Sequence, residues 1–441
     1  MVWACQEGKE VFESVNETIT GPLRGVRILE FSQIIAGPVA GIYLSDFGAD
    51  VIKVEPLEGE SRRNSAAVVP NEGKYFQSLN RGKRSLALDL KSESGLNIIR
   101  RLLPSVDVVL INYRNGVAER LGIDYLSLRK IRPDIIYASI TGFGNSGPHT
   151  TKGGSDIVAQ AYSGVMAAEG KIDENGAPLP VQVTPIIDKT SGLAAAMAIC
   201  AALYERERSG RGQELSLSLL QSGLDLLATR VMREPVHDVT VRDPLMNEID
   251  ARRSSGATYG ELMALRPKQT MRFTSHRLFY SGYHTKRGSL ILGALTQQNR
   301  DSVRKILNFY DETDSPDFDA STAENEIRVI DWKKELQTIF MEKEASVWEE
   351  LLNAVGVPVS SVHFAEEMSS DPQVIAMGMM SNLEHEVTGP QQVVGPIVQM
   401  SVTPTKARLP APKLGSHSES ILIEVGFTES EINQFRDEKV I

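Results

Sequence analysis

The residue with the clearest chemical potential is Asp188, which stands in the segment TPIIDKTSG. It follows an extended, proline-containing stretch and comes just before residues 190–207, an Ala-rich segment whose pattern predicts a helix. Helix-end amides would keep a carboxylate there ionised and nucleophilic, and the small residues Ser191, Gly192 and Ala194 leave room for a bulky substrate. An aspartate in this place is also typical of an ordinary N-cap, so the local sequence leaves both interpretations open.

Two further groups of polar residues could bind a ligand. The segment Asn80–Ser85 (NRGKRS) is the densest basic cluster, and Lys91 lies just beyond the strand-like run SLALDL. Lysine and arginine form charge-assisted bonds to phosphate oxygens, although short charge runs are often only solvated. Asn112, Tyr113 and Arg114 directly follow the apolar run DVVLI and supply an amide, an aromatic ring and a guanidinium. Their alternative interpretation is a turn in which Asn112 caps the next element.

The sequence lacks the motifs of several common kinds of functional site. The first strand-like run is followed by Ser32–Pro38 (SQIIAGP) rather than by G-x-G-x-x-G, which argues against a nicotinamide or flavin site. The seven histidines show no paired helical spacing, and Cys5 and Cys200 are far apart, so we predict no metal. There is no G-x-S-x-G or Walker-type loop, which removes the commonest hydrolase and kinase interpretations.

These residues must be positioned by an α/β domain. Short β-rich runs at 26–31, 50–55, 107–111 and 135–141 alternate with helical patterns such as 94–104 and 117–129. This alternation predicts a doubly wound, parallel, Rossmann-like sheet that binds its ligand at the carboxyl ends of the strands. Residues 213–229 are expected to begin a further helix. Two helices are expected near the C-terminus, the second capped by Thr428 with Glu431 three residues on.

Composition narrows the class of protein. A chain of 441 residues is long enough for two domains, and 24% charged residues with 41% hydrophobic residues are typical of a globular protein. We see no apolar run near the length of a bilayer span, and the net charge of −10 argues against nucleic acid and anionic membranes as partners. The N-terminus lacks a signal-peptide pattern and cysteines are few, so we expect a cytoplasmic protein.

Taken together, the segments resemble the class III CoA-transferases, a family that includes formyl-CoA and carnitine CoA-transferases and is related to the α-methylacyl-CoA racemases. The resemblance runs from about Gly21 to Phe435. It is carried in the family's order by PLRGVRILEFSQIIAGPVAGIYLSDFGADVIKVEP, LNRGKRSLALDLK, DVVLINYRNGVAERLGIDY, IIYASITGFGNSGP, DIVAQAYSGVMAAEG, IIDKTSG, ERSGRGQELSLSLL, LLNAVGVPVSSV, DPQV and LGSHSESIL.

The resemblance implies a role for each candidate residue. Asp188 would be the carboxylate that accepts the acyl group, and coenzyme A itself would be substrate and product, with no other cofactor. The residues that would lie along the coenzyme are Gln33, Ile34, Ile35, Ala36, Leu88, Lys91, Asn112, Tyr113 and Arg120, with Lys91 and Arg120 near its phosphates.

The resemblance also implies an interlaced homodimer. The Rossmann-like large domain would be built from both chain ends, with a smaller α+β domain between them. We therefore expect residues 1–230 to form the first part of the large domain, 231–270 a linker and 271–375 the small domain. Residues 376–441 would return to complete the large domain with C-terminal helices.

Three positions depart from the family pattern. Pro56 follows Glu55 where several transferases have an arginine, and no run of glycines occurs between 240 and 300. Ser155 stands before Asp156 where the racemases need a histidine. The expected activity is transfer of coenzyme A between two carboxylic acids through an aspartyl anhydride and an aspartyl-CoA thioester. The alternatives are a racemase-like isomerase, a CoA-ester lyase or hydrolase, and a non-catalytic CoA-binding protein.

Overall fold

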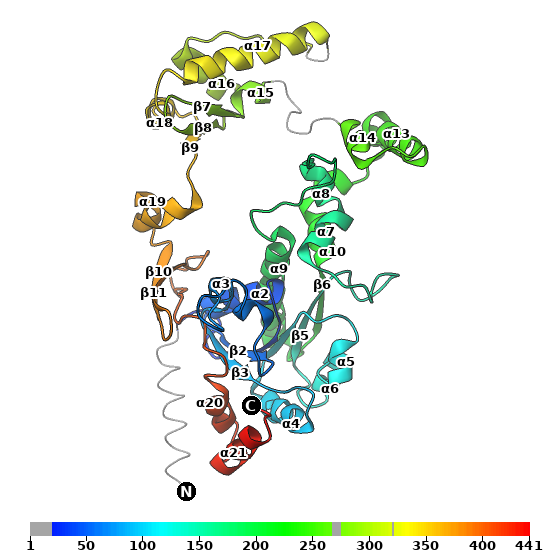
Figure 1. Cartoon of the computed structure of the whole chain (residues 1–441), viewed down its shortest axis with the longest axis vertical. Coiled ribbons are helices and arrows are strands. Elements are labelled where there is room, and N and C mark those ends of the chain that lie inside the picture. Colours follow the sequence, from blue (N-terminus) through cyan, green and yellow to red (C-terminus); the bar gives the residue numbers. More distant parts are fainter. Residues whose placement is uncertain (1–19, 267–274, 320–321) are drawn as a thin grey trace. The chain divides into compact units, whose positions relative to one another are not determined.

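The computed structural model describes residues 20–266, 275–319 and 322–441. The chain divides into two compact units, the first formed by Met1–Thr240 with Pro372–Ile441 and the second by Val241–Asp371. Both are traced in Figure 1. Part of the segment that we expected to be a linker is helical and is grouped with the second unit, as α13 (Asp243–Ser254) and α14 (Tyr259–Ala264).

The first unit is built on a six-stranded sheet. All neighbouring strands are parallel and their order is β3-β2-β1-β4-β5-β6, the strand order of a Rossmann fold. The strands are β1 (Arg27–Phe31), β2 (Asp50–Glu55), β3 (Lys83–Ala87), β4 (Val108–Ile111), β5 (Ile136–Thr141) and β6 (Glu214–Ser218). The predicted α/β class with a parallel sheet is confirmed.

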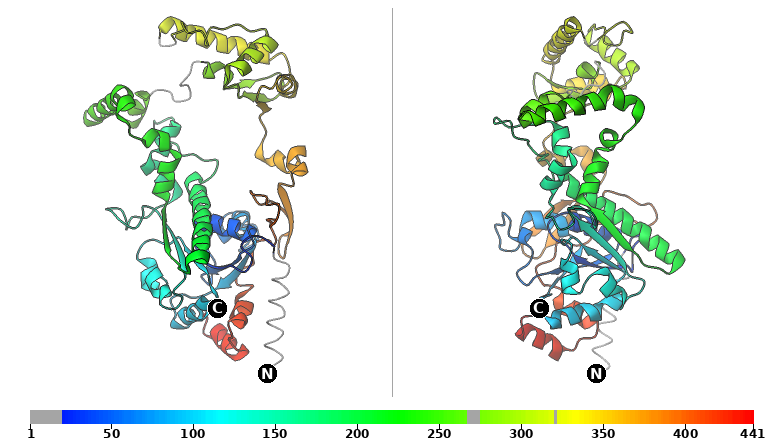
Figure 2. Two further views of the ribbon diagram at one scale, coloured as in Figure 1. Left: turned by 180° about the vertical axis from the view of Figure 1, so that it is seen from behind. Right: turned by 90° about the vertical axis from the view of Figure 1, so that its right-hand side faces the viewer.

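The sheet is buried on both faces because its side chains alternate between two cores. In β4, Val108 belongs to one hydrophobic cluster and Val109 to the other. The cluster of Val108 includes residues of α2 (Ala36–Asp46), α9 (Ile186–Ser209) and α10 (Leu219–Leu226). The cluster of Val109 includes residues of α4 (Glu93–Leu102), α20 (Ser418–Glu424) and α21 (Glu429–Asp437). Figure 2 shows the red C-terminal helices beside this part of the first unit.

The remaining helices of the first unit are shorter. They are η1 (Ser61–Arg63), α3 (Lys74–Asn80), η2 (Leu103–Ser105), α5 (Val117–Leu121), α6 (Tyr125–Arg129), α7 (Asp156–Ser163), α8 (Val165–Glu169), α11 (Ala228–Val231), α12 (Pro235–His237) and α19 (Pro372–Ala376). The π-helical turn η3 (Asp238–Arg242) includes the boundary between the two units in the sequence. The antiparallel hairpin of β10 (Met380–His385) and β11 (Gly389–Val394) also belongs here. The expected capping box of Thr428 and Glu431 is present at α21.

Three local predictions need correction. Residues 214–218, which we expected to begin a helix, form strand β6 at the edge of the sheet. The predicted helix 117–129 is two short helices, because Gly122 adopts φ 65° and ends α5. Helix α9 begins at Ile186, so Asp188 lies inside its first turn rather than before it.

Helix α9 is also longer and more apolar than we expected. By length and composition alone it could cross a membrane, and it is the single helix of the described residues that meets this test. Its buried residues Ile187, Ala195 and Ile199 nevertheless pack in the core of the first unit together with residues of α2. In all, 39% of its apolar window is buried.

The second unit has its own core. It contains α15 (His276–Phe279), α16 (Gln297–Leu307), α17 (Ala323–Phe340), α18 (Ala345–Asn353) and η4 (Ala365–Ser370). Its antiparallel sheet is formed by β7 (Gly282–His284), β8 (Ser289–Leu292) and β9 (Val359–Ser361). Aromatic residues such as Phe340 and Trp348 fill the space between these elements.

Candidate active site

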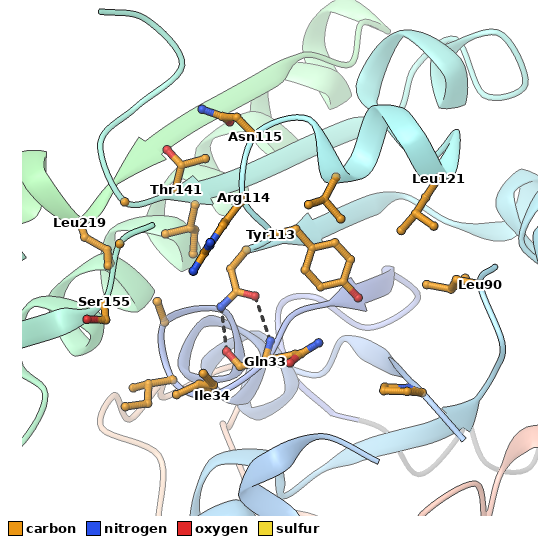
Figure 3. A pocket seen from close by; sticks show the side chains of 18 of the residues that line it. Gln33, Ile34, Leu90, Tyr113, Arg114, Asn115, Leu121, Thr141, Ser155 and Leu219 are labelled. Atoms are coloured by element: carbon orange, nitrogen blue, oxygen red, sulfur yellow. Dashed lines mark hydrogen bonds between the residues drawn. The ribbon is translucent and has the colours of Figure 1, made fainter. Parts of the chain in front are cut away.

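The turn after β1 has an unusual backbone. Ile34 adopts φ 71°, in the left-handed region that β-branched residues rarely enter. Two side chains hold it there. Asn112, directly after β4, accepts a bond from the N–H of Gln33 at 2.9 Å and donates to the carbonyl of Gln33 at 2.8 Å, as Figure 3 shows. Glu60 accepts a bond from the N–H of Ile34 at 3.3 Å.

This turn borders a cavity of about 840 Å³ at the carboxyl ends of the strands. Its volume is in the range of sites that hold a cofactor-sized ligand. The cavity is lined from β1 by the turn 33–36, from β4 by the segment 112–115 and from β5 by Thr141 and Gly142. The position agrees with the general rule for open parallel sheets, in which ligands bind where strand order reverses, here between β1 and β4.

Asp188 reaches the cavity because α9 packs very closely on α2. One helical turn after Asp188, a side chain on Gly192 would meet the carbonyl oxygen of Ala36 at 2.7 Å and Val39 at 2.6 Å. Glycine at this position therefore allows the close approach that sets Asp188 beside the turn 33–36. The side chain of Asp188 is 9% exposed and lines the cavity.

Asp188 does not cap α9. The carboxylate of Asp156 does so, since its Oδ1 atom accepts bonds from the N–H groups of Ile187 at 2.8 Å and of Asp188 at 3.0 Å. Gln160 donates to the other oxygen of Asp156 at 2.6 Å. Within the described residues, the carboxylate of Asp188 has no hydrogen-bond or ion-pair partner. The N-cap interpretation of Asp188 is therefore wrong.

The electrostatics of Asp188 also differ from the expectation. Burial, helped by the negative charge of Asp156, raises the pKa of Asp188 to about 7, while the positive charge of Arg62 acts in the opposite direction. We expected the helix terminus to keep this carboxylate ionised. The terminus fails to do so because the first N–H groups of α9 bond to Asp156 instead. The carboxylate is held in a state where it readily changes protonation near neutral pH.

Most of the sequence-predicted site residues meet in this one cavity. Those that line it are Gln33, Ile34, Ile35, Ala36, Leu88, Lys91, Asn112, Tyr113 and Asp188. Burial raises the pKa of the Tyr113 phenol, which points into the cavity in Figure 3. Arg120 is not among the lining residues. It lies exposed on α5, although Val117 and Leu121 of the same helix do line the cavity.

The basic cluster Asn80–Ser85 is structural. Arg81 forms a buried ion pair with Asp46, and the ammonium of Lys83 is completely buried against Glu30 at 2.8 Å. Arg84 pairs with Asp50 and with Glu424, each at 2.6 Å. None of these three cations lines the cavity. The suggestion that this cluster holds phosphates is therefore wrong for Arg81, Lys83 and Arg84.

Other polar residues of the cavity escaped the sequence prediction. They include Glu58, Asp89, Asn115, Thr141, Thr150, Lys152 and Ser155. Thr141 could have been found, because it ends β5 beside β4 at the ligand-binding edge. Lys152 could not, since its place depends on a close contact between two loops. A side chain on Gly154 would lie 2.4 Å from the Cα atom of Gly142, so these two glycines bring the segments together.

Both positively and negatively charged side chains line the cavity. Lys91, Arg114 and Lys152 are exposed cations, Asp188 is a buried carboxylate, and the carboxylates of Glu58 and Asp89 also line the cavity. Among residues 20–266, 275–319 and 322–441, no group of three or more His, Cys, Asp or Glu side chains is placed to hold a metal ion. Lysine and arginine side chains can bind anionic groups of a ligand, and a buried carboxylate without a partner is available for reaction.

Comparison with known proteins defines the class. The family model for CoA-transferase family III matches residues 23–418. The chain therefore belongs to CoA-transferase family III, and this membership supports CoA transfer as its general activity.

Individual relatives are similar over nearly their whole length. The chain is 34% identical to the succinyl-CoA:glutarate CoA-transferase of Mus musculus, covering 92% of this chain and 86% of the relative. It is also 34% identical to the succinate–glutarate CoA-transferase of Agrobacterium fabrum, covering 92% and 96%. A CAIB/BAIF family protein from Brucella suis superimposes with a TM-score of 0.71 at 27% identity, over 92% of this chain and 100% of the other.

Proposed function

We propose that the protein moves coenzyme A between two carboxylic acids and that Asp188 carries the acyl and CoA groups in turn. The observation that supports this most directly is the placement of Asp188. Its buried carboxylate has no hydrogen-bond or ion-pair partner among the described residues, and it lines the same cavity as the turn 33–36 and the pair Asn112–Tyr113. A buried carboxylate without a structural partner is costly, and this cost is expected for a group kept for reaction.

The proposed reaction has four steps. A carboxylate oxygen of Asp188 attacks the thioester carbonyl of the donor, the C–S bond breaks, and CoA thiolate leaves an acyl-aspartyl anhydride. The thiolate attacks the aspartyl carbonyl carbon, which releases the donor acid and forms an aspartyl-CoA thioester. The acceptor carboxylate attacks this thioester to form a second anhydride and free thiolate. The thiolate then attacks the acceptor's acyl carbon, and the carboxylate of Asp188 is restored.

Each step exchanges one activated acyl bond for another. The reaction therefore needs positioning more than driving force. Gln33, Ile34, Ile35 and Ala36 would lie along the coenzyme, on a turn whose backbone is held by Asn112 and Glu60. Tyr113 and Leu88 would contact the coenzyme, and Lys91 would bind its phosphates. We retain Arg120 as a phosphate ligand on the resemblance alone.

The test is to trap the covalent carboxylate. The protein is incubated with succinyl-CoA and hydroxylamine, digested, and analysed by mass spectrometry. Attack of hydroxylamine on the anhydride or the aspartyl thioester should leave a hydroxamate on the peptide that contains Asp188. A CoA-binding protein would give no modification, and a hydrolase that activates water directly would release acid and CoA with Asp188 unmodified. Either result would refute the proposal.

We also propose that the protein is a cytoplasmic homodimer that needs no further cofactor. Support for the dimer comes from α9, where Leu193, Met197 and Tyr204 are 44%, 70% and 67% exposed on one side of the helix. A second copy would cover this stripe. Sedimentation over a dilution series tests it, since a folded, active monomer at working concentrations would contradict the assignment.

A further inference from the structure

Ser155 is a polar residue of the cavity whose hydroxyl is not used by the fold. It occupies the N-cap position of α7, where a serine ordinarily accepts a hydrogen bond from the helix backbone. Its side chain makes no such bond, and in the part of the chain that the structure describes no other group bonds to the hydroxyl. Ser155 lines the cavity instead, and Figure 3 shows it among the side chains of the cavity wall. The hydroxyl is therefore available to a ligand or to a reacting group.

The backbone that carries Ser155 is fixed by contacts on both of its sides. Before it, Gly154 touches the backbone of Gly142 so closely that a side chain on Gly154 would lie 2.4 Å from the Cα atom of Gly142. After it, the carboxylate of Asp156 bonds to two N–H groups at the start of α9, at 2.8 and 3.0 Å. The hydroxyl of Ser155 is thus attached to a segment with little freedom to move.

This segment lies next to the carboxylate that we propose to react. The Oδ1 atom of Asp156, the residue directly after Ser155, is 3.0 Å from the backbone nitrogen of Asp188. Helix α7, which Ser155 precedes, packs against α9, which carries Asp188. Both Ser155 and Asp188 line the same cavity. Since the Cα atoms of neighbouring residues are about 3.8 Å apart, the hydroxyl of Ser155 and the carboxylate of Asp188 lie at the same end of this cavity.

The proposed reaction creates a negative charge on Asp188 that needs a hydrogen-bond donor. When the CoA thiolate attacks the anhydride at the carboxyl carbon of Asp188, a C–S bond forms and the electron pair of the C=O double bond moves to the oxygen. The oxyanion collapses when the C–O bond to the leaving acid breaks. The same oxyanion forms again when the acceptor carboxylate attacks the aspartyl-CoA thioester. Donors that are held at the place where such charge develops lower the barrier, often more than any other contribution.

The donors of α9 that lie closest to Asp188 are already used. The N–H groups of Ile187 and Asp188 bond to Asp156. The hydroxyl of Ser155 is a free donor, and its O–H bond can rotate toward either oxygen of the carboxylate. A hydrogen bond to a charged oxygen is about twice as strong as one to a neutral oxygen, so this contact strengthens as the oxyanion develops.

We propose that Ser155 is a catalytic residue whose hydroxyl donates a hydrogen bond to the oxyanion that forms on the carboxyl group of Asp188. This inference rests on the proposed CoA transfer and adds a second residue to its chemistry. Ser155 keeps its proton throughout, so the step needs no base. Because the oxyanion forms on the enzyme, the contribution of Ser155 is the same for every acid that reacts.

The experiment compares Ser155→Ala, which removes the hydroxyl, with Ser155→Thr, which keeps one. With succinyl-CoA as donor and glutarate as acceptor, kcat and the KM of each substrate are measured. A second assay follows the exchange of labelled succinate into succinyl-CoA, which needs no second acid. The control Ser420→Ala removes an exposed hydroxyl of α20 that bonds to the carbonyl of His417. Thermal unfolding of each variant shows whether the fold is intact.

We expect Ser155→Ala to lower kcat by roughly 100-fold, the loss typical of one oxyanion donor, while both KM values change much less. The succinate exchange should fall by the same factor, and the Tm should stay that of wild type because the hydroxyl has no partner in the fold. Ser155→Thr should retain more activity than Ser155→Ala, and Ser420→Ala should match wild type. An unchanged kcat in Ser155→Ala, or a loss confined to one KM, would overturn the inference while CoA transfer stands. Absence of transfer to any acid in wild type would instead refute the proposed function.

Discussion

Replacing Asp188 with asparagine should stabilise the protein, and the gain should depend on pH. Asparagine has nearly the same size and shape but carries no charge at any pH. Burial and the charge of Asp156 raise the pKa of Asp188 to about 7 in the folded chain, whereas an unfolded chain has an ordinary aspartate. Between these two pKa values the folded state binds a proton that the unfolded state does not. The free energy of unfolding therefore falls as the pH rises through this interval.

The magnitude follows from the two pKa values. Moving from the ordinary value of 3.8 to about 7 corresponds to a cost of about 4 kcal/mol for the ionised side chain, at about 1.4 kcal/mol for each pH unit. The full cost is present only above pH 7, where the folded protein must also carry the charge. At pH 5 the buried carboxyl is still protonated, and the cost of about 1.5 to 2 kcal/mol comes from the unfolded side chain being ionised.

The measurement is chemical denaturation of wild type and of Asp188→Asn at pH 5 and pH 8, without CoA. We expect the variant's advantage to be larger at pH 8 than at pH 5 by about 2.5 kcal/mol. The control is Asp331→Asn on α17, which removes a surface charge and should change the free energy of unfolding by less than about 0.5 kcal/mol at both pH values. Equal stability of wild type and Asp188→Asn at pH 8 would refute the reasoning, because it would mean that the carboxylate is not destabilised in the fold.

Four other predictions concern activity and substrate binding. Asp188→Ser should stay folded and bind CoA esters while CoA transfer drops to background, since serine cannot form the anhydride at a useful rate; substantial transfer by the pure variant would move attention to Asp156. In wild type, kcat/KM for the acyl-CoA should rise with pH through about 7, because the ionised form of Asp188 is the nucleophile that we propose. Asp156→Asn retains the cap and removes a charge, so the midpoint should fall by about 1 pH unit; an unmoved midpoint would contradict the role of that charge. Lys91→Gln should weaken binding of CoA esters by about 1–3 kcal/mol, and an unchanged KM would remove Lys91 from the site.

The parts of the site that follow from strand order could be predicted from the sequence. Residues directly after a parallel strand must lie at its carboxyl end, and this alone brings the turn 33–36 and Asn112–Tyr113 together. The β-rich runs are local signals. They predicted four of the six strands of the sheet closely, with β6 as the strand that was mistaken for a helix.

Properties that depend on contacts between distant parts of the chain could not be predicted from the sequence. The basic cluster Asn80–Ser85 looks like a phosphate site in the sequence, yet its cations are used by Asp46, Glu30 and Asp50 from other elements. Asp156 becomes the cap of α9 although it lies 32 residues before Asp188. The ionisation of Asp188 therefore could not be predicted from the sequence, because the N–H groups at the start of α9 that would stabilise its carboxylate already bond to Asp156.

The ionic residues beneath the turn explain how a strained site can be kept in one shape. A buried ion pair contributes little net stability, because desolvation offsets the attraction, but it penalises any rearrangement that leaves one charge alone. Glu30, Lys53 and Glu60 form such a set, and Glu60 also bonds the N–H of Ile34. The left-handed conformation of Ile34 costs about 1–3 kcal/mol. It is maintained by a hydrogen bond to Glu60, whose buried charge would lose its partner if the turn rearranged. Since Glu60 joins this ionic set to the backbone of Ile34, a shift of the turn that lines the cavity would have to separate buried charges.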